Sequence, residues 1–310
     1  MIVAKARHGL FLATLVALPG MLAGSAHAYV RAVTSLGVQV WWGSPCITMG
    51  LYLGAPPPSM KADAYWNASQ LAARTWSQGD IACTGLSITM ARQAESSADI
   101  GLDQKNVILF RTDVWCRPDS STDPGACYAA NALAITTVFK NKTTGEIVDA
   151  DMEINAVNFA WADLAADPSQ ADGRTADFQN TLTHELGHVI GLAHNCYTAN
   201  DGPSPLFDNT GNPEVLCGGA DTPATVYDAT MYPAVALTDT ERRTLSSDEV
   251  QAACDIYPSS QGTCGMGSGD GCSVVGPAHA SPHRSGAIAV LCTLALAFAG
   301  FAYRRSRPPA

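Results

Sequence analysis

Few residues of this chain are charged, and most of the charged residues are acidic. Only 15% of its 310 residues are charged, and the formal net charge is −10. A chain with so little positive charge is a poor partner for nucleic acid or for a generally anionic lipid surface, so we exclude those classes. A content of 47% hydrophobic residues instead indicates one globular domain with appendages. The net charge neither favours nor disfavours a peptide substrate.

Histidine is also scarce, and positions 29–183 contain none. The body of the chain holds three, His184, His188 and His194, within the sequence HELGHVIGLAH. His184 and His188 are one helical turn apart, so a helix would present both imidazoles on one face. Gly191 can adopt a positive φ, which would end that helix and bring His194 in as a third ligand.

This spacing predicts a catalytic zinc site. Three imidazole ligands leave one coordination position for water, whereas structural zinc sites usually have four protein ligands. Glu185 lies beside the first ligand and can act as a general base without binding the metal. His-Glu-x-x-His alone also occurs on ordinary surface helices. The added glycine and third histidine make the longer pattern a known zinc-protease motif.

Residues 184–194 resemble the zinc signature of the metzincin metallopeptidases. Met231, in the sequence ATMYP, is similar to the Met-turn beneath the metal in that family, and Met-Tyr-Pro resembles the matrixin branch. Residues 245–258 resemble the closing helix of matrixins, and the likeness extends from Val38 to Pro258. The resemblance implies an α+β fold with a twisted, mixed five-stranded sheet and three main helices. It places a zinc cleft between an upper and a lower subdomain.

The same resemblance implies a zinc-dependent endopeptidase that hydrolyses peptide bonds of extracellular proteins. His184, His188 and His194 would hold Zn²⁺, and Glu185 would be the general base. Met231 would form a packed floor with no chemical role. One alternative is a surface-displayed adhesion or binding protein with a structural zinc, and the presence of Glu185 argues against it. Another is a zinc hydrolase of non-peptide amides, which the Met-turn argues against.

The chain departs from the matrixin pattern in several places. It has no upstream histidines for the second, structural zinc of matrixins, and a disulfide between Cys116 and Cys127 is expected to replace that metal. Asn195 follows the third ligand, where matrixins commonly have Ser or Thr. The loop from Asn195 to Met231 is longer than usual, and no cysteine-containing propeptide precedes the domain.

Strands are predicted at 46–53, where apolar residues alternate, and at 86–91, 107–113, 132–139 and 146–154. Helices are predicted at 59–78, from 172–176 through the zinc motif, and after Ser246, where Ser246 and Glu249 form a capping box. By the matrixin resemblance, residues 133–139 would be a sheet edge that binds substrate, the alternative being an ordinary hairpin. Asp149 and Asp151 are candidate Ca²⁺ ligands, although we expect solvated turn residues there.

Ten cysteines in an exported chain indicate disulfides, and none has the Cys-x-x-Cys spacing of a metal site. Cys272 and Cys292 lie in the C-terminal tail, which leaves an even number of eight. Sequence proximity suggests four pairs, although connectivity cannot be deduced from sequence. The hypothesised pairs are Cys116–Cys127, Cys196–Cys217, Cys254–Cys264 and Cys46–Cys83.

Both ends of the chain carry targeting features. Residues 1–28 read as a signal peptide, and residues 29–258 as the catalytic domain. A linker (259–285), an apolar transmembrane segment (286–303) and a basic cytoplasmic tail (304–310) follow. This end, with Cys272 before the span, resembles the sorting signals of myxobacterial surface proteins. The resemblance implies a sorting protease acting near Cys272 and an exported protein at the cell envelope or surface, or released from it. The alternative is a plain anchor with one free cysteine.

Overall fold

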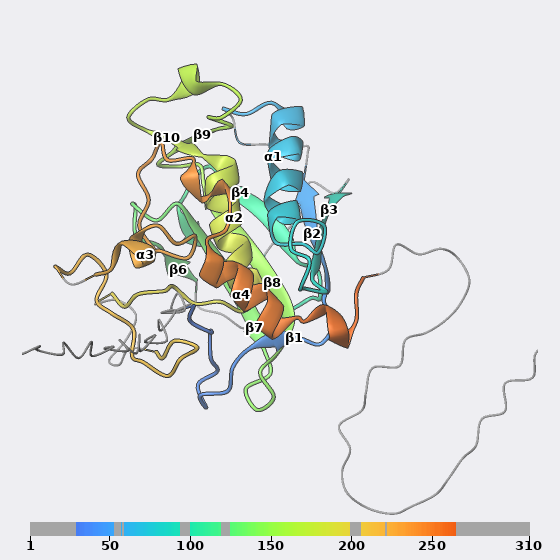
Figure 1. Cartoon of the computed structure of the whole chain (residues 1–310). Helices are drawn as coiled ribbons and strands as arrows, with labels where there is room; N and C mark the ends of the chain where they lie inside the picture. The colour runs from blue at the N-terminus through green and yellow to red at the C-terminus, as the bar shows by residue number, and fades with distance from the viewer. Residues whose placement is uncertain are drawn as a thin grey trace, which may run out of the picture. The chain divides into compact units, whose positions relative to one another are not determined.

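The computed structural model describes residues 29–52, 57, 59–93, 100–118, 125–198, 206–220 and 222–264 (Figure 1). The chain divides into two compact units, 1–270 and 271–310, and all described residues belong to the first. The predicted signal peptide, most of the linker, Cys272, the transmembrane segment and the basic tail lie outside the described residues. Within the described ranges, no helix combines the length and apolar character needed to cross a membrane.

The domain is a mixed α/β structure built on one mostly parallel sheet, which is compatible with the predicted α+β class. Its strand order is β1-β8-β4-β2-β3, with β7 paired to β8. All the pairings are parallel except that of β7 with β8, so the described part of the sheet has an antiparallel strand at one edge. The strands are β1 (Trp41–Trp42), β2 (Cys46–Tyr52), β3 (Ser87–Gln93), β4 (Val107–Arg111), β7 (Ala134–Lys140) and β8 (Glu146–Asn155).

The five predicted strands are all present, but the described residues form a sheet of six strands, so the predicted count is wrong. The additional strand is β1, whose two residues pair with the start of β8. Two residues are too few to give a readable alternation, and sequence reasoning had no means to find them. Two small two-stranded sheets lie outside the main one. They are formed by β9 (Ala160–Ala162) with β10 (Thr175–Asp177), and by β5 (Cys116–Arg117) with β6 (Ala126–Cys127).

Three longer helices accompany the sheet, as predicted: α1 (Ala62–Thr75), α2 (Phe178–Val189) and α4 (Ser247–Ile256). The short helix α3 (Ala224–Tyr227) and the 3₁₀ turns η1 (Pro168–Gln170), η2 (Glu241–Arg243) and η3 (Ser259–Gln261) complete the described set. Helices α1 and α2 pack against each other and against the sheet (Figure 1). Their apolar faces form the core with the sheet, and its largest fully buried side chains include Trp76, Tyr65, Phe178 and Trp161.

Two helix starts differ from the predictions. The first helix begins at Ala62 and not at Ser59, because the Ser59 hydroxyl donates to the Trp161 carbonyl and accepts from the Trp161 N–H, at 2.8 and 2.7 Å. Helix α2 begins at Phe178, since Thr175–Asp177 pairs as strand β10. The Ser246–Glu249 capping box at the start of α4 is confirmed.

A polar ladder runs along β8 and contradicts the expectation for Asp149 and Asp151. Asp149, Asp151, Glu153 and Asn155 alternate along the strand and are all fully buried. Backbone N–H groups between residues 101 and 107 donate to the two aspartates, and Arg111, Arg117 and Tyr128 donate to Glu153. The aspartates are therefore not solvated turn residues. The connection between β3 and β4 supplies the backbone donors to the two aspartates. Arg117 and Tyr128, which lie in the connection between β4 and β7, donate to Glu153, so the donors that burial requires are present.

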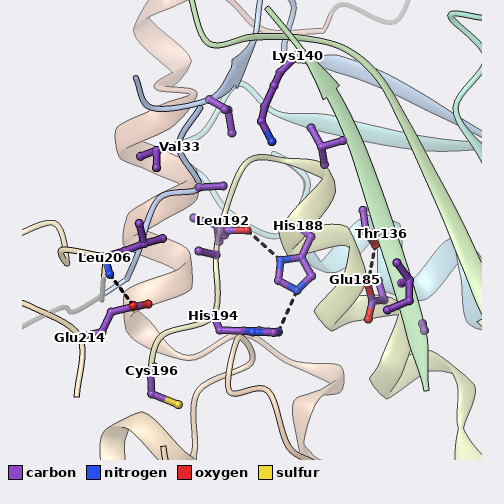
Figure 2. A pocket seen from close by; sticks show the side chains of 16 residues that line it. Val33, Thr136, Lys140, Glu185, His188, Leu192, His194, Cys196, Leu206 and Glu214 are labelled. Carbon is purple, nitrogen blue, oxygen red and sulfur yellow. Dashed lines mark hydrogen bonds between the residues drawn. The ribbon is translucent and has the colours of Figure 1, made fainter. Parts of the chain in front are cut away.

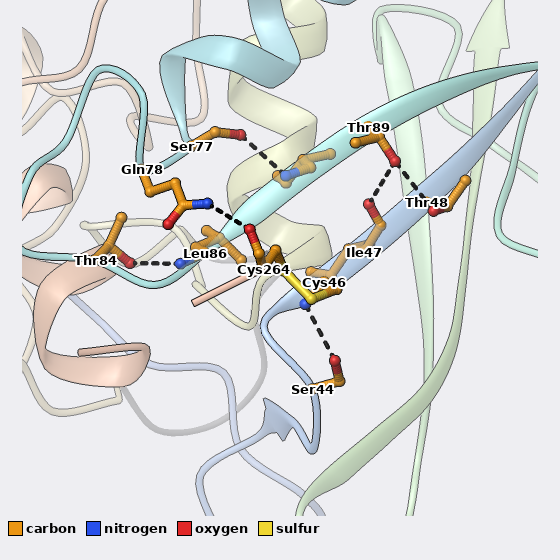
Figure 3. Close-up of a disulfide and its surroundings, with 11 residues drawn as sticks. Ser44, Cys46, Ile47, Thr48, Ser77, Gln78, Thr84, Leu86, Thr89 and Cys264 are labelled. Carbon is orange, nitrogen blue, oxygen red and sulfur yellow. Dashed lines mark hydrogen bonds between the residues drawn. A yellow bond between two sulfur atoms is a disulfide. The ribbon is translucent and has the colours of Figure 1, made fainter. Parts of the chain in front are cut away.

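The described residues form four disulfides, and two of them pair differently from the prediction. Cys116–Cys127 and Cys196–Cys217 are confirmed. The predicted Cys46–Cys83 and Cys254–Cys264 bonds are wrong, because the structure has Cys83–Cys254 and Cys46–Cys264. Figure 3 shows the Cys46–Cys264 bond. The start of β2, the loop before β3 and the C-terminal end of the domain meet at one corner. Proximity along the chain therefore gave the wrong partners for these four cysteines.

Candidate metal centre

Helix α2 carries the first two candidate ligands, and it is fixed at both ends. The Asp177 side chain caps its N-terminus by accepting from the Asn180 N–H at 2.8 Å, and Arg243 donates to both oxygens of that carboxylate. At the C-terminus, Trp42 Nε1 and the Tyr257 hydroxyl donate to the carbonyl groups of residues 189 and 190. These bonds satisfy helix-end groups that would otherwise lack partners, so the helix is held in a defined position.

The structure brings the three predicted ligands together. Gly191 has φ +99°, and a Cβ there would approach the Val40 carbonyl oxygen to 2.8 Å, so a glycine suits this turn. The chain then returns His194 toward His188 of α2 (Figure 2). One ligand atom from each imidazole lies within 4.8 Å of the others, and His188 Nε2 is 3.2 Å from His194 Nε2. Among the described residues, no other group of histidine, cysteine, aspartate or glutamate meets this criterion.

Backbone carbonyl groups orient two of the three rings. His184 Nδ1 lies 2.6 Å from the Thr230 carbonyl oxygen, and His188 Nδ1 lies 2.9 Å from that of Leu192. A carbonyl can only accept, so each Nδ1 carries the proton and each Nε2 keeps a lone pair. This is the outer-shell arrangement typical of metal-binding histidines. Burial, together with the two neighbouring imidazoles, lowers the pKa of His184 well below its ordinary value, which keeps it neutral. The donor set fits a zinc ion.

Glu185 lies at the cleft beside these ligands but is not one of them. Its side chain is nearly buried, with 6% exposed, and it lines the cleft together with His188 and His194. Its Oε2 accepts a hydrogen bond of 2.6 Å from the Thr136 hydroxyl of β7 (Figure 2). Burial raises the pKa of this carboxyl above its ordinary value, and the bond from Thr136 opposes that rise. A carboxylate beside the candidate ligands can accept a proton and then donate it, which is the task of a general base.

Met231 packs directly beneath the helix that carries the ligands. A Cβ placed on Gly187, between the two helical histidines, would lie 2.2 Å from Met231 Sδ and 3.1 Å from Trp76 Cζ2. The methionine is 2% exposed, and its N–H donates to the buried carboxylate of Glu249 at 3.0 Å. Its carbonyl accepts from the Asn195 N–H at 3.2 Å. Asn195, which departs from the matrixin pattern, therefore joins the third-ligand loop to the Met-turn.

A cleft runs past the histidines along β7. Two cavities, of about 520 and 540 Å³, flank the ligands, and both are lined by Ala134, Ile135, Glu185 and His194. The shared lining makes them two parts of one depression. The first cavity is also bordered by the N-terminal segment, which includes Ala32 and Val33. The second is bordered by residues 232–237, which follow the Met-turn.

Sequence reasoning missed several residues that shape this site. Thr136 carries no motif, because a threonine in a strand is common and its partner Glu185 is 49 residues away. Thr230 precedes Met231 in the Met-turn and has no predicted role of its own, whereas in the structure its carbonyl orients His184. The alternation along 132–139 could have indicated that Thr136 shares a strand face with Ala134 and Val138. The strand pattern could not have shown which residues contact that face.

Neither a scan against protein-family models nor a search of curated proteins finds a match to this chain.

Proposed function

We propose that this protein is a zinc-dependent endopeptidase of the metzincin type, similar to the matrixin branch. The observation that carries the proposal is the convergence of His184, His188 and His194 beside Glu185 at a cleft. In His184 and His188, Nδ1 faces a backbone carbonyl and Nε2 therefore keeps its lone pair, which is the arrangement typical of metal-binding histidines. A glutamate next to such a group favours hydrolytic chemistry.

Features away from the ligands support the same branch. The sheet is mostly parallel, and β7 pairs antiparallel with β8 at the edge beside the cleft. Gly191 supplies the turn between the second and third ligands, and Met231 lies under Gly187. Each of these follows from the resemblance stated above, and each depends on different residues, so together they support it more strongly than the zinc motif does alone.

The cleft suits an extended peptide. Strand β7 pairs with β8 on one side, and its residues Ala134, Ile135 and Thr136 line the cleft. A peptide added along a free strand edge gains main-chain hydrogen bonds that do not depend on its sequence. The substrate class that we propose is therefore protein or unfolded peptide, with side-chain preferences set by the cavities on either side of the histidines.

The proposed mechanism assigns a task to each group of this chain. When bound, Zn²⁺ would lower the pKa of a water molecule that it holds and polarise the carbonyl of the scissile bond. His184, His188 and His194 would hold the ion through nitrogen lone pairs. Glu185 would accept a proton as water adds to the peptide carbonyl carbon, and then donate it to the leaving nitrogen as the C–N bond breaks. The nearly buried position of Glu185 limits competing contact with bulk water.

The proposed location is outside the cytoplasm. Four disulfides within one domain favour an oxidising compartment. The proposal also includes retention at the cell surface through residues 286–303 and processing near Cys272. Both concern residues outside the described ranges.

The test compares the full-length protein with three variants on labelled casein, with and without a zinc chelator. We expect chelator-sensitive hydrolysis, about one zinc per chain by elemental analysis, and loss of zinc in His194→Ala. Glu185→Gln should retain zinc but lose turnover by roughly 100- to 10,000-fold, which is the usual contribution of a general base. Glu146→Gln, a change at an exposed glutamate, is the matched control and should leave turnover unchanged.

The outcomes separate the proposal from its rivals. Folded protein that contains no transition metal would contradict the metal site. Zinc-loaded protein that cleaves no peptide bond, and that binds a protein ligand equally well with Glu185→Gln, would instead support an adhesion or binding protein with a structural zinc. Full turnover by Glu185→Gln would refute the assignment of the base.

A further inference from the structure

The candidate base is held from two elements that lie on opposite sides of the cleft. Glu185 projects from α2, and the hydroxyl that binds its Oε2 at 2.6 Å belongs to Thr136 of β7 (Figure 2). No other hydrogen bond of the Glu185 side chain is found among the described residues. One carboxylate oxygen is therefore anchored, and the other is available to a proton.

Such an anchor has a specific physical consequence. A glutamate side chain has three rotatable bonds, and general-base catalysis requires its oxygen within about 2.6–3.2 Å of the proton donor. A hydrogen bond to a charged carboxylate is short and stronger than one between neutral groups, so it can select one rotamer. The strand supplying the hydroxyl is also held rigidly, since β7 pairs with β8 along its whole length.

We propose that Thr136 is a positioning residue for hydrolysis, which holds Glu185 in the orientation that accepts the proton of the attacking water. This inference rests on the proposed function. The competing explanation is that the hydroxyl only satisfies a buried carboxylate and so contributes to stability. The two explanations differ in whether turnover, as distinct from substrate binding and folding, depends on the hydroxyl.

Two substitutions isolate the hydroxyl. Thr136→Val replaces it with a methyl group and keeps the branched shape, so the strand and its packing are preserved. Thr136→Ser keeps the hydroxyl and removes the methyl group. Thr89→Val makes the same hydroxyl-to-methyl change at an exposed residue of β3, at the far edge of the sheet, and is the matched control.

The measurements are kcat and KM on one peptide substrate, with zinc content and thermal unfolding recorded for every variant. We expect Thr136→Val to lower kcat by about 10- to 100-fold with KM within about twofold, because a misplaced catalytic group costs rate and not binding. Thr136→Ser should recover most of the loss, and Thr89→Val should match the unmodified protein. Zinc content should be unchanged throughout.

A second measurement does not depend on activity. This measurement is a double-mutant cycle in metal-free protein. The equilibrium constant of unfolding is measured for Thr136→Val, for Glu185→Ala and for the double variant. If the two side chains share a direct hydrogen bond, the effect of the double variant on that constant should differ by about tenfold from the product of the two single effects. Additive effects would overturn the contact itself.

The kinetic outcomes are equally decisive. The proposal is overturned if Thr136→Val keeps its kcat, if it raises only KM, or if Thr136→Ser is as impaired as Thr136→Val. Failure of the proposed function is a separate result, because the unmodified protein would then show no chelator-sensitive hydrolysis although the unfolding cycle could still report the bond.

Discussion

Substituting Gly187 by alanine sets two physical effects against each other. Gly187 lies inside α2, where an alanine normally stabilises a helix by about 1 kcal/mol relative to glycine. Here the new methyl group would lie 2.2 Å from Met231 Sδ, whereas ordinary contacts between heavy atoms are about 3.5–4.0 Å. The sulfur would therefore have to retreat by more than about 1 Å.

That retreat is obstructed. Trp76 Cζ2 would lie 3.1 Å from the same methyl group, and the Met231 backbone is held by bonds to Glu249 and Asn195. Overpacking of this kind costs about 1–3 kcal/mol, and the severe overlap places this case at the upper end. After subtracting the gain in helix propensity, we expect Gly187→Ala to destabilise the domain by about 2 kcal/mol.

Urea denaturation of the metal-free protein measures this change, and metal removal separates packing from ligand binding. The double variant Gly187→Ala/Met231→Ala tests the cause. Met231→Ala alone should cost about 2–5 kcal/mol through the space that it leaves, and the added methyl group should recover part of that loss. An increase in stability on Gly187→Ala, or additivity of the two changes, would refute the reasoning.

Two further predictions concern the polar ladder of β8. Glu153→Gln should destabilise the domain by about 3–5 kcal/mol in urea denaturation, because it removes the charge that compensates Arg111 and Arg117, whereas exposed Glu146→Gln should have little effect. Burial raises the pKa of Asp151 to about 7, above its ordinary value of 3.8. The folded state therefore binds that proton more tightly than the unfolded state, and stability from this group is complete below pH 3.8 and decreases as the pH rises through 7. Unfolding free energies measured between pH 4 and 8 should show this decline, and a decline of equal size in Asp151→Asn would contradict the assignment to Asp151.

The parts of the site that the sequence predicted are those encoded by neighbouring residues. His184 and His188 share a helix face because of their spacing, and Gly191 takes a positive φ a few residues later. The Ser246–Glu249 capping box is likewise local. The five strands predicted from the sequence are all present, with boundaries shifted by one or two residues in most cases. For such features the backbone geometry follows directly from residue type and spacing.

The parts that could not be predicted depend on tertiary contacts. Cys46 and Cys264 are separated by 218 residues, so sequence proximity suggested other partners. Asp149 and Asp151 have the pattern of a half-solvated strand, and they are buried because the connection between β3 and β4 donates backbone N–H groups to them. Thr136 meets Glu185 because β7 and α2 face each other, and neither segment alone carries that information.

The Cys46–Cys264 bond also determines how the domain would respond to mechanical load. Cys264 is the last described residue, and its disulfide returns the chain to the first residue of β2. β2 is an interior strand, paired with β3 on one side and β4 on the other. A force applied to the chain beyond residue 264 would therefore enter the domain at an interior strand and bypass α4. Traction on the chain beyond that residue would thus leave the last helix in place, and with it the Glu249 contact to Met231 beneath the histidines.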